Sequence, residues 1–159
     1  MQLDRAVAEF LALNRVAVAG VSRSGKSPAN AIAQRLRDSG RTVFALNPSG
    51  ETIDGHPSYA RLDQIEGGVE GLVVVTNPAH ATALAEEAAR AGVGWVWFHQ
   101  GFGPVSFDAT TLQTAHRLGL KVIAAACPMM YLDPDPFHRC ARTVFRWVGR
   151  IPAEVAEGP

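Results

Sequence analysis

The segment Gly20–Ser27 carries the residue types of a phosphate-binding loop. It reads Gly-Val-Ser-Arg-Ser-Gly-Lys-Ser and fits the pattern G-x-x-x-x-G-K-S. Glycine and serine leave backbone N–H groups accessible to a phosphate, and a helix that begins after the loop adds positive potential. The candidate ligand contacts from this loop are Gly20, Val21, Ser22, Arg23, Lys26 and Ser27.

An enzyme that hydrolyses nucleoside triphosphates needs more than this loop. An acidic side chain at the end of another core strand must organise Mg²⁺. The later predicted strands end in Thr76-Asn77, His99-Gln100 and Ala126-Cys127, and none of these residues is acidic. The pattern therefore disfavours a P-loop phosphotransferase, which stays open as an alternative beside a glycine-rich turn that binds nothing.

The residues at the end of the second predicted strand indicate which kind of nucleotide the protein could bind. NAD-binding domains carry G-x-G-x-x-G in the first loop and an acid after the second strand, which accepts a hydrogen bond from a ribose hydroxyl. This loop lacks that pattern, and the strand ends in Asn47-Pro48. A carboxylate there would repel a phosphorylated ribose, whereas neutral Asn47, with Lys26 or Arg23 nearby, would not. The charges favour coenzyme A (CoA) or NADP over NAD, so an NADP-type oxidoreductase is a second alternative.

Few side chains have the spacing of catalytic or metal-binding groups. Cys127 follows a strand near the expected binding edge, and its thiol could exchange with a ligand thiol. A small buried residue is the simpler interpretation. His138 and Cys140 have no second cluster of ligands, which argues against zinc. His99 is interpreted as a histidine at the pocket rim, with a general base or a ligand contact as the alternative. We therefore predict no catalytic residue and no metal site.

The loops that carry these residues separate short apolar runs from longer alanine-rich ones. Strands are predicted at 15–19, 42–46, 71–76, 94–99 and 121–126, helices at 3–13, 28–39, 78–91, 107–118 and 137–148, and a loop at 47–60. Continuous apolar strands between helices indicate a parallel sheet that is covered on both faces. The predicted fold class is α/β: a Rossmann-like, doubly wound, five-stranded parallel sheet, ordered 3-2-1-4-5, in three layers and a single domain. Ligands bind beyond the carboxyl ends of such strands, which adds Thr76, Asn77, Pro78, Gln100 and Gly101 to the candidate contacts.

The length, composition and charge of the chain indicate which general class of protein it belongs to. A chain of 159 residues fits one domain, which we place at 1–150 with a C-terminal tail at 151–159. Fifteen Lys and Arg balance fifteen Asp and Glu, so we expect neither nucleic acid nor a membrane as partner. We expect a cytoplasmic location, because no signal peptide is visible in the first residues. Four arginines recur at helical spacing near the C-terminus: Arg139, Arg142, Arg146 and Arg150. We interpret them as a solvent-exposed helix face, with an interface to a homo-oligomer or to an acidic partner as the alternative.

Several short segments together resemble a known family. They are Val16–Ser22, Val43–Pro48, Ile53–Tyr59, Leu72–Val75, Trp97–Gly101 and Cys127-Pro128. The chain resembles the CoA-binding domain family, the relatives of the N-terminal domain of the succinyl-CoA synthetase alpha subunit, over residues 14–131. The Gly-Val-Ser turn alone is a weak signal, but it is more specific together with Asn47-Pro48 and Gln100-Gly101.

This resemblance implies a Rossmann-like fold with CoA or an acyl-CoA across the strand ends. The first loop would meet the phosphates, Asn47 and Pro48 would border the adenosine part, and Thr76, Asn77 and Pro78 would line the neighbouring crevice. Gln100 and Gly101 would flank the far side. The synthetase domain with the phosphorylated histidine has no counterpart, because only about 30 residues follow Cys127. We therefore expect a non-catalytic CoA-binding protein.

Overall fold

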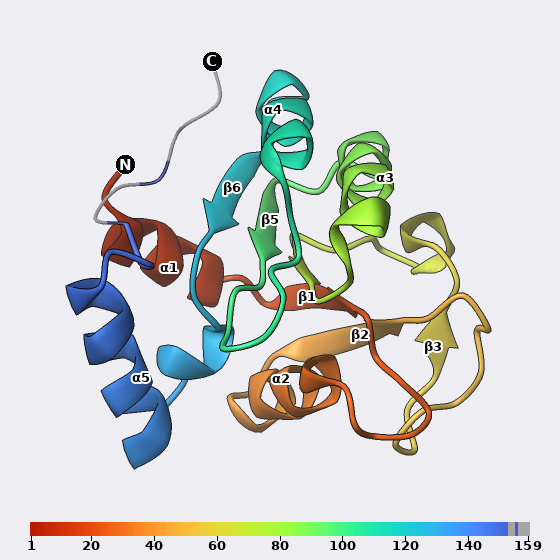
Figure 1. Ribbon diagram of the computed structural model, residues 1–159. Coiled ribbons are helices and arrows are strands. Elements are labelled where there is room, and N and C mark those ends of the chain that lie inside the picture. The colour runs from red at the N-terminus through yellow and green to blue at the C-terminus, as the bar shows by residue number, and fades with distance from the viewer. Residues whose placement is uncertain (153–154, 156–159) are drawn as a thin grey trace.

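The computed structural model describes residues 1–152 and 155, in which helices alternate with parallel strands (Figure 1). The helices are α1 (Leu3–Leu11), α2 (Pro28–Asp38), α3 (Pro78–Arg90), α4 (Ala109–Arg117) and α5 (Pro136–Trp147). The strands are β1 (Arg15–Ala19), β2 (Thr42–Leu46), β3 (Ser58–Tyr59), β4 (Gly71–Val74), β5 (Trp95–Phe98) and β6 (Lys121–Ala124). Two short 3₁₀ helices, η1 (Leu62–Gln64) and η2 (Pro128–Met130), complete the set.

Local sequence explains where the helices begin. Proline opens α2, α3 and α5, where its missing N–H costs no helical hydrogen bond. The Ser27 side chain caps α2 by accepting from the Ala29 N–H, and Asp135 caps α5 by accepting from the His138 N–H. These caps fix the chain direction at the edge of the sheet where the strands end.

All neighbouring strands pair in parallel, in the order β3-β2-β1-β4-β5-β6. The α/β, Rossmann-like prediction is confirmed, but the sheet has six strands rather than five. The sixth is β3, which lies in the segment predicted as a loop and pairs with β2 through two residues. The predicted order was wrong for the strand at 71–76: β4 pairs with β1 on the side away from β2.

Helices cover both faces of the sheet and make three layers. On one face, Val16, Val73, Trp95 and Trp97 pack against α1, α2 and α5. On the other face, Ala17, Leu72, Val96 and Phe98 pack against α3 and α4 (Figure 1). Alternate residues of each strand therefore enter different cores, which explains the continuously apolar strand sequences.

The two ends of the described chain meet. The Val155 N–H donates to the Met1 carbonyl at 2.9 Å, and Ile151 and Val155 are buried in the core that also holds α1. Of the tail expected at 151–159, positions 153–154 and 156–159 lie outside the described residues. Among the described residues, no helix has the length and apolar character needed to cross a membrane.

Candidate functional site

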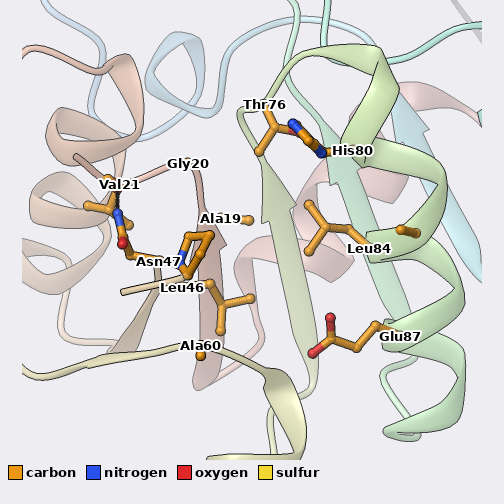
Figure 2. A pocket seen from close by; sticks show the side chains of 12 residues that line it. Ala19, Gly20, Val21, Leu46, Asn47, Ala60, Thr76, His80, Leu84 and Glu87 are labelled. Carbon is orange, nitrogen blue, oxygen red and sulfur yellow. Dashed lines mark hydrogen bonds between the residues drawn. The ribbon is translucent and has the colours of Figure 1, made fainter. Parts of the chain in front are cut away.

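The carboxyl ends of β1, β2 and β4 border a hollow of about 380 Å³ beside α3, which we call the α3 pocket. It lies where the strand order reverses, the usual ligand position in an open parallel sheet. Five predicted residues line it: Gly20, Val21, Asn47, Pro48 and Thr76. Figure 2 shows the loops after β1 and β2 facing the side chains of α3 across this space. Its size is within the range of small-molecule sites.

Gly20 lets the first loop turn close against the end of β4. Its φ is +102°, and a Cβ atom at this position would lie 2.1 Å from the Val75 carbonyl oxygen. No side chain fits that space. The glycine therefore brings the backbone of the first loop into the wall of the α3 pocket.

Asn47 joins the loops after β1 and β2. Its Nδ2 donates to the Val21 carbonyl at 2.7 Å, while its Oδ1 accepts from the Ser49 N–H and hydroxyl. The Asn47 backbone N–H donates to the Tyr59 carbonyl. The side-chain amide thus positions the wall of the pocket, which Asn47 itself lines.

The segment 22–27 differs from a ready-made phosphate cradle. The N–H of Ser22 donates to Asn30 Oδ1 at 2.9 Å, and the N–H of Gly25 donates to the Ser22 carbonyl at 3.1 Å. The N–H groups of Ser24 and Lys26 point to serine hydroxyls of the same loop. Most of these amides therefore already have acceptors. The Lys26 side chain is exposed, so its ammonium group offers a positive charge to a phosphate.

The other basic residue of this loop is paired. Arg23 Nη1 lies 2.6 Å from Glu51 Oε2, and both side chains are more than half exposed. An exposed pair of this kind is weak and exchanges readily with water. Arg23 therefore remains available for a phosphate only in competition with Glu51.

Helix α3 supplies a wall that sequence reasoning missed. His80, Leu84 and Glu87 follow one another at helical spacing, and all three line the α3 pocket (Figure 2). Ala83 of the same helix lines it as well. Glu87 Oε1 accepts a hydrogen bond of 2.6 Å from the Leu62 N–H, so this carboxylate holds η1 in place. The i, i+4, i+7 spacing was the available signal, but it did not reveal which face of the helix meets the strand ends. Ala19, Leu46 and Ala60 complete the lining.

A second hollow of about 520 Å³ opens between the ends of β4, β5 and β6 and the start of α5. We call it the α5 pocket. Three predicted residues line it, namely Thr76, Asn77 and Gly101. Thr76 belongs to both pockets, so the two hollows adjoin across the end of β4.

His99 and Cys127 also line the α5 pocket, and both are buried. Burial lowers the pKa of His99, which keeps the imidazole neutral near pH 7. Burial raises the pKa of the Cys127 thiol to about 11. The thiol is therefore protonated at neutral pH and is a poor nucleophile, in line with the simpler interpretation of this residue.

The remaining predicted ligand contacts line neither the α3 pocket nor the α5 pocket. They are Ser22, Arg23, Lys26, Ser27, Pro78 and Gln100. Ser27 and Pro78 serve as helix starts, and the Gln100 N–H donates to the Ala126 carbonyl at 3.1 Å. Within residues 1–152 and 155, no three His, Cys, Asp or Glu side chains gather in a way that could hold a metal ion.

Comparison with known proteins connects this site to a family. Residues 14–133 match the CoA binding domain family. The ADP-forming acetate–CoA ligase I of Archaeoglobus fulgidus is 30% identical over 118 residues, which are 70% of this chain and 17% of the ligase. This chain thus spans less than a fifth of that relative.

Solved structures share the fold. A hypothetical protein from Pyrococcus horikoshii OT3 superposes with a TM-score of 0.72 at 23% identity, over 81% of this chain and 91% of its own. The acetyl-coenzyme A synthetase 1 of Ca. Korarchaeum cryptofilum gives a TM-score of 0.59 at 21% identity, over 69% of this chain and 25% of its own. The family match covers both loops of the α3 pocket and all six strands of the sheet, and the chain belongs to the CoA-binding domain family.

Proposed function

We infer that this protein binds CoA or an acyl-CoA across the carboxyl edge of its sheet and acts as a binding module. The observation that carries the proposal is the overlap of the family match at 14–133 with the α3 pocket. Gly20, Val21, Asn47, Pro48 and Thr76, which were predicted from the sequence, lie together in that pocket.

The shape of the carboxyl edge of the sheet favours one orientation of a bound CoA molecule. The adenosine part would occupy the α3 pocket between Pro48 and Leu84, because both supply apolar surface to a flat ring. The diphosphate would cross the first loop, where Lys26 offers a positive charge. The rest of the molecule would pass Thr76 towards Asn77 and Gly101.

The protonation states of the two candidate reactive groups, Cys127 and His99, support a binding function rather than catalysis. Cys127 is a protonated thiol at neutral pH, and buried His99 is a weaker base than an exposed histidine because burial lowers its pKa. Neither group is primed for nucleophilic attack. The proposed function therefore includes no ligase reaction.

Thermal-shift measurements with CoA, NADP, NAD and ATP test the proposal. A ligand in excess of its dissociation constant raises the melting temperature by mass action. We expect CoA to give the largest shift and NAD the smallest, with no requirement for Mg²⁺. A shift with NADP or Mg·ATP in the absence of any CoA effect at millimolar concentration would contradict the proposal and support one of the two enzyme alternatives.

A further inference from the structure

The lining of the α5 pocket has a chemistry of its own. Phe102, Phe137, Met129 and Met130 are among the residues that line it, and the rings of Phe102 and Phe137 pack against each other with their centroids 5.6 Å apart. Among the residues that line it in the described chain, none is Lys, Arg, Asp or Glu. Such a lining suits an apolar group.

The position of the α5 pocket beside the α3 pocket determines which part of a ligand can enter it. Thr76 is common to both, at the end of β4. A ligand with its nucleotide in the α3 pocket would enter the α5 pocket with its opposite end. In CoA that end is the thiol, and in an acyl-CoA it is the acyl chain.

The polar groups of the α5 pocket offer no free charge to a ligand. Buried His99 is neutral near pH 7, and its ring has no hydrogen-bond partner among the described residues. His138 Nδ1 lies 2.8 Å from Asp135 Oδ2, so any positive charge on that ring already faces a carboxylate. A carboxylate on an acyl chain would lose water here without gaining a counterion.

We propose that the α5 pocket binds the acyl chain of an acyl-CoA and selects uncharged, apolar chains over chains that end in a carboxylate. This inference rests on the proposed function, because CoA must occupy the α3 pocket for an acyl chain to reach the α5 pocket. It adds a second site and a ligand class to that function.

Calorimetric titration with CoA, hexanoyl-CoA and glutaryl-CoA tests the inference. Hexanoyl-CoA should bind at least about tenfold more tightly than CoA, which is roughly the effect of burying two methylene groups. Glutaryl-CoA should bind no more tightly than CoA. Phe137→Ala should reduce the hexanoyl-CoA to CoA affinity ratio at least threefold. Phe137 is 63% exposed, so its truncation spares the core.

Val144→Ala is the matched control, because Val144 lies on the same helix, is 44% exposed and does not line the pocket. It should leave the ratio unchanged. Equal affinities for CoA and hexanoyl-CoA, or an unchanged ratio in Phe137→Ala, would overturn the acyl pocket and leave CoA binding intact. Glutaryl-CoA binding as tight as that of hexanoyl-CoA would overturn the charge selection. Failure of all three ligands to bind would instead overturn the proposed function, and the acyl pocket with it.

Discussion

The side-chain amide of Asn47 donates a 2.7 Å hydrogen bond to the backbone carbonyl of Val21. This bond spans 26 residues of sequence and connects the loops that follow the first two strands of the sheet. Both residues line the α3 pocket. The pocket's shape therefore depends on a side chain whose position after β2 would hold an acid in an NAD-binding domain.

Asn47→Ala should loosen this connection. The substitution removes the bond to Val21 and leaves the Ser49 N–H and hydroxyl without their acceptor. We expect a loss of about 1–2 kcal/mol in the free energy of unfolding, measured by urea denaturation, and at least fivefold weaker CoA binding. Gln113→Ala on the exposed face of α4 is the control. CoA affinity equal to that of the wild type would show that the bond does not shape the binding site.

Gly20→Ala should be far more harmful than Gly25→Ala. Both glycines have positive φ, but only a Cβ at Gly20 would collide with backbone, at 2.1 Å from the Val75 oxygen. A Cβ at Gly25 would meet no other atom within 4 Å. Gly25→Ala should therefore cost about 1–2 kcal/mol of backbone strain, and Gly20→Ala at least about 3 kcal/mol. Similar urea midpoints for the two variants would refute this view of the first loop.

Lys26→Ala should weaken CoA binding through lost phosphate attraction. Because most amides of segment 22–27 already have acceptors, the exposed ammonium supplies the positive charge for the phosphate. We expect roughly a three- to tenfold rise in the dissociation constant at low salt and a smaller rise at high salt, measured by calorimetry. Lys121→Ala is the control, since Lys121 begins β6 at the opposite edge of the sheet. An equal effect of both substitutions would indicate only a general effect of net charge.

His99 should make stability depend on pH. Burial lowers its pKa below the ordinary 6.5, so the unfolded chain takes up a proton at a higher pH than the folded chain. The stabilising contribution is complete above about pH 6.5 and is lost as the pH falls towards the folded-state pKa. The drop in urea midpoint between pH 7.5 and pH 5.5 should therefore be smaller in His99→Gln than in the wild type. The same drop in both proteins would assign the effect to other groups.

The sequence predicted the elements whose signals are local. Continuous apolar runs such as Val16–Ala19 identified the main strands, and the longer alanine-rich runs between them identified the helices. The strand Ser58–Tyr59 was missed, because two residues are too few to show a period. The wrong position for Gly71–Val74 has a different cause: strand pairing follows from long-range packing and leaves no local pattern.

The candidate site shows the same difference between residues with a local sequence signal and residues that long-range packing brings into place. Gly20, Asn47 and Thr76 were predictable because they follow strands whose ends share one edge of the sheet. His80, Leu84 and Glu87 were not, because the rotation of α3 against the sheet decides which of its faces meets the pocket. The hydrogen bond of the Ser22 N–H likewise depends on Asn30, a helix residue whose side chain carried no signal of its own.

Blocking the α3 pocket is the most direct test of the account. Ala83 lines this pocket, and Ala12, after α1, is an exposed alanine on the opposite face of the sheet. Calorimetric titration of CoA into Ala83→Trp should show at least tenfold weaker binding than the wild type, while Ala12→Trp should bind normally. Unchanged CoA affinity in Ala83→Trp would show that the nucleotide binds elsewhere on the protein.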